Sequence, residues 1–239
     1  MLDVLAIGAH PDDVELSCGG TLALLAAAGR RVGILHLTGG EAGTRGTPAE
    51  RRREAERAGE VLGCREVVFL DCGDGAFRTG AAEEDALIAE LRRLRPELVL
   101  SPAAADRHPD HGRAHRLVAD ACFYAGLKRR GDGEPHRPAA VFSYMQHDPF
   151  EPTFVVDVSA VWEVKERALD AYETQLHQAG REPRAAAPTK VASPEFRLAI
   201  AGRARHFGLM INAAYGEPFW SPLPLAVRDP LGILPGGVR

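Results

Sequence analysis

Two short clusters of histidine, proline and aspartate lie far apart in this chain of 239 residues. The first is Ala9–Asp13 (AHPDD), and the second is Asp106–His111 (DRHPDH). Neutral imidazoles and carboxylates are the ligands that zinc takes in catalytic sites, where one coordination position stays open for water. The two clusters therefore predict a hydrolytic metal site, provided that the fold brings them together.

The residues expected to bind the metal are His10, Asp13 and His111. Pro11 keeps His10 out of the helical backbone region, so the turn can aim His10 and Asp13 at one point. Two imidazoles and one carboxylate form a catalytic rather than a structural zinc arrangement. We expect Zn²⁺, and other divalent metals also suit such ligands. The plainer interpretation is that Asp12 or Asp13 only caps the following helix.

Each cluster has polar side chains left over after the ligands are assigned. Asp12 suits a general base that takes a proton from water. His108, if protonated, could stabilise an oxyanion or give a proton to a leaving amine, and Asp110 could hold a histidine in place. Arg107 lies inside the second cluster, where a guanidinium can bind a carboxylate or acyl oxygen with two hydrogen bonds. The remaining histidines are expected to be surface or packing residues, and His147, which follows a strand, is the one among them that could lie near the pocket.

The elements that must position these residues alternate between apolar strands and helices. Strands are expected at 4–8, 31–37, 67–70 and 98–100, and helices at 21–28, 48–62, 83–94 and 112–127. Such alternation predicts an α/β fold: a Rossmann-like, mostly parallel sheet with helices on both faces. Ligands bind beyond the carboxyl ends of parallel strands, and both clusters fall there, as does the turn at 38–44.

The second half of the chain has a different pattern. Strands are expected at 141–145 and 154–158, a long amphipathic helix at 161–177, and a last helix at 195–209. Residues 179–194 predict a loop, and the tail after Glu217 is expected to be irregular because it is rich in proline and glycine. We interpret residues 1–239 as one domain, with a Rossmann-like core at 1–130 and a C-terminal elaboration at 131–239.

Composition excludes several classes of partner. The formal net charge is −4, so nothing favours nucleic acid or an anionic membrane surface. No apolar run reaches the roughly 18 residues that span a bilayer. The glycine-rich segments match neither nucleotide fingerprint, which disfavours a dinucleotide oxidoreductase. The four cysteines show no CxxC spacing, and we expect a cytoplasmic protein.

The sequence resembles the LmbE-like, or PIG-L, family of zinc-dependent N-acetylglucosamine deacetylases. The resemblance lies in the AHPDD and RHPDH segments and in Thr38–Glu41, and it runs from about Leu2 to Phe219. Further segments resemble the bacillithiol branch, whose members remove acetyl from N-acetylglucosaminyl malate. They are Arg51 with Glu54, Tyr144–Met145, Ala171–Gln175 and Tyr215–Phe219.

The resemblance implies the same ligands, His10, Asp13 and His111, with Asp12 as base and His108 as its partner. It implies that the substrate is a small amino sugar, that the assembly is a homo-oligomer, commonly a hexamer, and that the substrate contacts are Arg107, Arg51, Glu41 and Tyr144. Another N-acetylglucosaminide is the alternative substrate: a mycothiol precursor, a thiol S-conjugate or a chitobiose-like sugar. A metal-dependent binding protein is the non-enzymatic alternative, although binding alone would not need Asp12 and His108.

Overall fold

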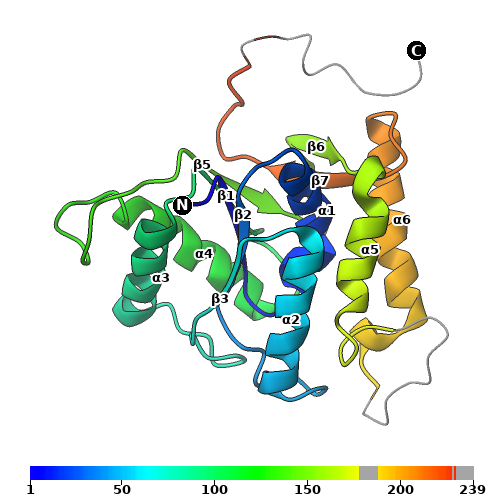
Figure 1. Ribbon diagram of the computed structural model, residues 1–239, viewed down its shortest axis with the longest axis horizontal. Helices are drawn as coiled ribbons and strands as arrows, with labels where there is room; N and C mark the ends of the chain where they lie inside the picture. The colour runs from blue at the N-terminus through cyan, green and yellow to red at the C-terminus, as the bar shows by residue number, and fades with distance from the viewer. Residues whose placement is uncertain (178–187, 228, 230–239) are drawn as a thin grey trace.

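The computed structural model describes residues 1–177, 188–227 and 229. Its centre is a seven-stranded sheet in the order β3-β2-β1-β4-β5-β7-β6 (Figure 1). The strands are β1 (Val4–Gly8), β2 (Val32–His36), β3 (Glu66–Phe69), β4 (Leu98–Pro102), β5 (Ala140–Tyr144), β6 (Phe154–Asp157) and β7 (Gly216–Trp220). The helices are α1 (Asp13–Ala27), α2 (Pro48–Leu62), α3 (Ala81–Leu94), α4 (Pro109–Tyr124), α5 (Trp162–Asp170) and α6 (Pro194–Met210), with short 3₁₀ turns at Ser159–Val161 and Lys190–Ala192.

Five strands, β3 to β5 in the sheet order, pair in parallel, as the alternating sequence pattern predicts. Successive residues of β1 face opposite layers, because side chains alternate along a strand. Val4 and Ala6 pack in a core with α1, α2, α5 and α6, whereas Leu5 and Ile7 pack in a second core with α3 and α4. Figure 1 shows these two helix layers on either side of the sheet. The α/β fold with helices on both faces is therefore confirmed.

The site depends on the middle of this sheet. Strand β1 pairs with β2 on one side and with β4 on the other, in register Val4↔Val32 and Val4↔Leu98. The strand order therefore reverses beside β1, and such a switch point opens a crevice at the carboxyl ends of the strands. The AHPDD segment follows β1 and the DRHPDH segment follows β4, so both clusters meet at this crevice.

Three expectations about element boundaries are wrong. Helix α1 begins at Asp13 rather than at 21, and it is kinked at Cys18, whose φ of −135° and ψ of 19° are not helical. Gly19 and Gly20 lie inside the part of α1 that follows the kink. A Cβ on Gly20 would lie 2.9 Å from Glu217 Oε1, so glycine allows the helix to approach the sheet closely. The helix expected at 161–177 ends at Asp170, and the following residues form turns that contact α1 and α2.

The third error concerns the tail. Residues 216–220 form β7, which lies between β5 and β6 and runs antiparallel to both. A strand with a buried glutamate and a proline lacks the alternating apolar pattern of a half-buried strand, so the sequence pattern did not predict β7. The loop expected at 179–194 lies mostly outside the described residues. Within those residues, none of the helices combines the length and apolar character needed to cross a membrane.

Glu217 of β7 connects the second half of the chain to α1 through buried hydrogen bonds. Its carboxylate accepts hydrogen bonds from the main-chain amides of Gly20 and Thr21 at 2.9 and 2.6 Å. It also pairs with Lys165 of α5 at 2.5 Å, and both side chains of this pair are only 2% exposed. A buried charge that loses its partner is strongly destabilising, so this ion pair holds three elements together.

We predict that Glu217→Ala lowers the free energy of unfolding by about 3–5 kcal/mol, because it leaves the Lys165 ammonium buried without its counter-charge. Urea denaturation followed by circular dichroism would measure the change. Asp120→Ala, which breaks the exposed Arg116–Asp120 pair, is the matched control and should cost only about 0.3–0.5 kcal/mol. Equal losses in the two variants would contradict this role of Glu217.

Candidate metal centre

The Asp13 carboxylate lies between two imidazoles that come from different strands. Asp13 Oδ2 lies 3.4 Å from His10 Nδ1, and Asp13 Oδ1 lies 3.3 Å from His111 Nε2. Ligands placed tetrahedrally at about 2.0–2.1 Å around zinc are roughly 3.3–3.4 Å apart. Asp13 therefore lies beside both predicted imidazole ligands, through a different carboxylate oxygen for each. Among the described residues, the triplets whose possible ligand atoms all lie within 4.8 Å of one another are His10, His108 and His111; Asp106, His111 and His147; and His10, Asp74 and Asp110.

Carboxylates hold the far nitrogens of both imidazoles. His10 Nε2 lies 3.2 Å from Asp74 and 3.3 Å from Asp110, and His111 Nδ1 lies 2.8 Å from Asp106. A histidine that binds metal through one nitrogen normally gives its other N–H to a carboxylate, which fixes the tautomer and the ring. The predicted role of Asp110 as an orienting group is therefore directed at His10 rather than at His108.

Two residues that contact the predicted ligands, Asp74 and Gln146, were not identified from the sequence. Asp74 follows β3, and Gln146 follows β5 and donates from Nε2 to Asp13 Oδ1 at 2.7 Å. Asp106 belongs to the second cluster but carries no role in the sequence analysis. All three follow parallel strands at the same edge of the sheet, which is the one signal that could have pointed to them.

The charges around the cluster favour a bound cation. Burial lowers the pKa of His10, but the Asp110, Asp13 and Asp74 carboxylates raise it well above its usual range. Burial likewise opposes the charge on His111, yet Asp13 and Asp106 raise its pKa to about 9. Positive charge is stabilised here whether protons or a metal ion carry it, so the donor set fits the predicted divalent metal.

Asp12 stands beside this cluster in an unusual backbone conformation. Its φ of 93° lies in the left-handed region, and among the described residues its side chain makes no capping hydrogen bond to α1. The plainer interpretation, a helix cap, is therefore not supported for Asp12. Burial raises the pKa of Asp12 to about 7, although the Arg51 guanidinium opposes this shift. A carboxylate with such a pKa can exchange a proton near neutral pH.

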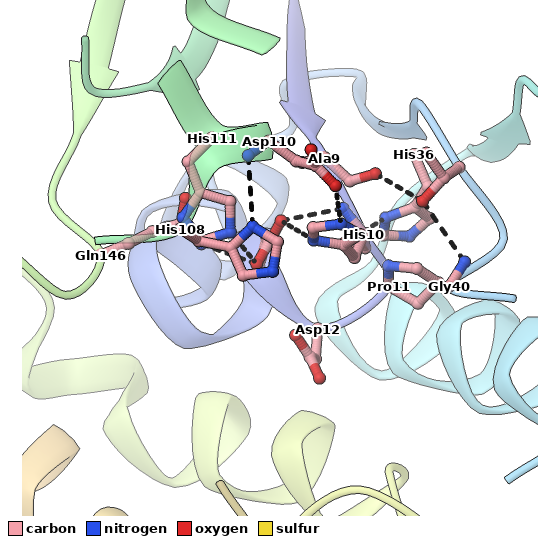
Figure 2. Close-up of polar contacts among 12 residues, drawn as sticks. Ala9, His10, Pro11, Asp12, His36, Gly40, His108, Asp110, His111 and Gln146 are labelled. Carbon is pink, nitrogen blue, oxygen red and sulfur yellow. Dashed lines mark hydrogen bonds and ion pairs between the residues drawn. The ribbon is translucent and has the colours of Figure 1, made fainter. Parts of the chain in front are cut away.

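His108 caps helix α4 and has a fixed tautomer. Its Nδ1 accepts a hydrogen bond from the main-chain amide of Asp110 at 3.2 Å, which leaves the proton of the neutral ring on Nε2. Its ring lies 4.8 Å from the rings of His10 and His111 (Figure 2). Burial and the neighbouring His10 lower the pKa of His108. The geometry thus suits a neutral N–H donor, not the imidazolium expected from the sequence.

The four predicted substrate contacts divide into two pairs. Arg107 is exposed, and its charge lies close enough to lower the pKa of His147 after the larger effect of burial. Glu41 is also exposed, and its carboxylate accepts from the Asp74 amide at 3.0 Å. Arg51 is 5% exposed and Tyr144 is fully buried, so the structure brings neither to the solvent.

Arg51 and Tyr144 both bind main-chain carbonyls. Tyr144 donates to Ile7 of β1 at 2.8 Å, and Arg51 donates to Pro11 and Gly40 at 2.9 and 2.8 Å. The expectation that these two residues contact substrate therefore does not fit the structure. His147 lies beside the cluster, where its ring stacks on His111 at 5.7 Å between centroids.

A cavity of about 630 Å³ lies in another part of the molecule. It is lined mainly by apolar side chains of α4, β5 and residues 220–226, among them Phe123 and Trp220. Catalysis needs convergent polar groups with shifted pKa values, and those gather at the strand ends instead. We therefore assign the functional site to the histidine and aspartate cluster.

Comparison with known proteins identifies the family of this chain. The sequence model of the family described as PIG-L, GlcNAc-PI de-N-acetylase, matches residues 5–122, which include all the candidate ligands. Diacetylchitobiose deacetylase of Thermococcus kodakarensis is 35% identical over 191 residues, covering 72% of this chain and 70% of that protein. The 4-oxalmesaconate hydratase of Pseudomonas putida is 32% identical over 194 residues, covering 72% of this chain and 74% of the relative.

Among solved structures, the conserved protein TT1542 of Thermus thermophilus is similar over nearly its whole length. It is 40% identical, covers 96% of this chain and 98% of its own, and superposes with a TM-score of 0.87. The similarity therefore extends through the C-terminal half as well as the metal centre. The chain belongs to the PIG-L, or LmbE-like, family of hydrolytic deacetylases.

Proposed function

We propose that this enzyme is a zinc-dependent N-deacetylase of a small N-acetylglucosaminide, with N-acetylglucosaminyl malate as its substrate. The observation that carries the reaction is Asp13 held between His10 and His111, each with a carboxylate on its far nitrogen. Three protein ligands and an open position are typical of catalytic zinc. The resemblance to the bacillithiol branch and the exposed Arg107 support the malyl group.

The proposed ligands are His10, Asp13 and His111. A divalent metal held there would polarise the amide carbonyl and make water more acidic. Asp12 takes a proton from the attacking water and passes it to the departing amine, so acetate and a free amino sugar are the products. His108 donates its Nε2–H to the carbonyl oxygen as negative charge develops on it.

A neutral His108 suits this task. Its Nδ1 already accepts from the Asp110 amide, so its remaining N–H is aimed without a choice of tautomer. A hydrogen bond to a developing oxyanion becomes stronger in the transition state than in the ground state, and that difference lowers the barrier. His108 would therefore act chiefly on kcat.

The hydratase relative supports a second candidate reaction, because adding water to a carbon–carbon double bond also needs an acidic water and a base. A single assay separates the two reactions. Acetate release is measured with three substrates: N-acetylglucosaminyl malate, the analogue in which inositol replaces malyl, and diacetylchitobiose. The assay tests for deacetylase activity and ranks the aglycones. A hydratase would release no acetate from any of them. The hexameric assembly and the cytoplasmic location stay predictions.

We predict about one equivalent of zinc per chain, the number expected for one three-ligand site. His111→Ala should lose both the metal and the activity, whereas His206→Ala, which removes a histidine from the exposed face of α6, should keep both. Elemental analysis of the purified proteins and an acetate assay with and without chelator would measure this. A His111→Ala protein with full metal content would show that the ligands are assigned wrongly.

Asp12→Asn should keep the metal and lose about 10²–10⁴-fold in kcat. Asparagine keeps the shape of the side chain but cannot take a proton, and a lost general base typically costs that much. Single-substrate kinetics together with elemental analysis would check the prediction. Normal turnover with the metal bound would remove Asp12 from the mechanism.

Arg107→Ala should weaken N-acetylglucosaminyl malate about ten- to hundredfold in kcat/KM, and N-acetylglucosamine much less. A charge-assisted hydrogen bond to a carboxylate is worth roughly 1.5–3 kcal/mol, and only the malyl substrate carries carboxylates. Arg116→Ala, which removes an arginine from the exposed face of α4, is the control and should change neither value. Equal losses on both substrates would argue against recognition of malate by Arg107.

A further inference from the structure

The peptide bond between Pro11 and Asp12 is held at both of its polar ends by buried side chains. Its carbonyl oxygen, on Pro11, accepts from Arg51 Nη2 at 2.9 Å. Its N–H, on Asp12, donates to the hydroxyl of Tyr172 at 3.0 Å. The two side chains come from α2 and from the turns after α5, so two separate parts of the chain act on one peptide plane.

This peptide needs such support because the backbone at Asp12 is strained. The φ of 93° at Asp12 is a conformation that residues with a Cβ adopt at a cost of about 1–3 kcal/mol. Such a backbone persists only where its surroundings enforce it. A different backbone angle at Asp12 would swing its carboxylate to another place, because the side chain leaves directly from that Cα.

Tyr172 is itself fixed by a second buried residue. Its hydroxyl donates to Glu15 Oε1 at 2.9 Å, and both residues are fully buried. A phenolic hydroxyl has one proton to give, so donation to Glu15 turns its lone pairs toward the Asp12 amide. Glu15 thereby sets the direction of the hydrogen bond that Asp12 makes.

Arg51, at the carbonyl end of the peptide, is likewise held in place by a second contact. Besides Pro11, it donates to the Gly40 carbonyl at 2.8 Å. Gly40 has a φ of +70°, and a Cβ there would overlap the Arg51 guanidinium. Arg51 Nη2 lies 3.8 Å from the Asp12 carboxylate, too far for a hydrogen bond, so the arginine acts on the backbone of this loop while its charge remains nearby.

We propose that Tyr172, Glu15 and Arg51 form a peptide clamp that places the carboxylate of Asp12 for proton transfer. They are positioning residues, since each acts through the Pro11–Asp12 peptide and not on the substrate. The proposal rests on the proposed function, in which Asp12 is the base. It gives Arg51 a task that differs from the substrate contact expected from the sequence.

The first test is Tyr172→Phe, which removes one hydroxyl and keeps the ring that fills the core. We expect kcat for acetate release to fall about tenfold or more, because small displacements of a catalytic group are costly. KM and zinc content should stay within about twofold of the native values, which a general loss of structure would not allow. Tyr215→Phe is the matched control, because its hydroxyl meets Arg205 away from the site, and it should leave kcat unchanged.

The second test places the same change in the Asp12→Asn background. If Tyr172 works only through the base, Tyr172→Phe should cost less than about twofold there, since coupled residues are not additive. The same fall in both backgrounds, or an unchanged kcat in the native background, would overturn the proposal. Arg51→Lys provides an independent route from the other end of the peptide, and it should show the same dependence on Asp12.

Hydrogen exchange tests the clamp independently of enzyme activity. Hydrogen exchange at the Asp12 amide should become at least about tenfold faster in Tyr172→Phe, because its buried partner is gone. Unchanged exchange would refute the clamp even in an active enzyme. Faster exchange in a protein that releases no acetate from any N-acetylglucosaminide would instead refute the proposed function and leave the clamp standing.

Discussion

The site depends on β4 lying directly beside β1. His10 follows β1 and His111 follows β4 at the start of α4, and the two imidazoles approach one Asp13 carboxylate only because those strands pair in register. A parallel pair needs a crossover connection, and here the connection comprises helices and two further strands that lie on the other side of β1. The reversal of strand order that this creates is also what opens the crevice at the strand ends.

Bringing these charges together would be costly if each carboxylate stood alone. Burial raises the pKa of Asp13, but His111 and His10 hold it well below its ordinary value. The pKa values of Asp106 and Asp110 are lowered as well. In addition to its histidine, Asp106 accepts from the main-chain amides of His108 and His147, and Asp110 accepts from that of Gly75. The cluster is therefore a network in which nearly every carboxylate oxygen has a donor, as buried polar groups require. Such a network would hold the three proposed ligands in place for a metal ion.

The convergence of the two clusters and the parallel sheet could both be predicted from the sequence because both have local signals. The clusters contain the chemistry in contiguous residues, and the apolar strands stand out against charged helices. Gln146 has no such signal, and Tyr172 stands out only as part of the resembling segment Ala171–Gln175, with no role assigned to it. The contacts of both residues exist because distant segments fold against α1. The family resemblance implied that Arg51 contacts substrate, and only the folded chain distinguishes its buried guanidinium from the exposed side chains of Arg52 and Arg53. Strand β7 was missed because its pairing with β5 and β6 compensates for a composition that disfavours strands.

Both halves of the chain contribute residues to the candidate metal centre. The family match at 5–122 contains all the candidate ligands and Asp12, and a hydratase and a deacetylase are both relatives of this chain. Chemistry that makes water acidic and removes its proton can be common to both, so the choice of substrate must depend on residues outside that arrangement. The later half reaches the centre through the buried residues Gln146 and Tyr172, which touch Asp13 and Asp12. The main-chain amide of His147, which donates to Asp106 at 2.8 Å, adds a third contact between the later half and the centre.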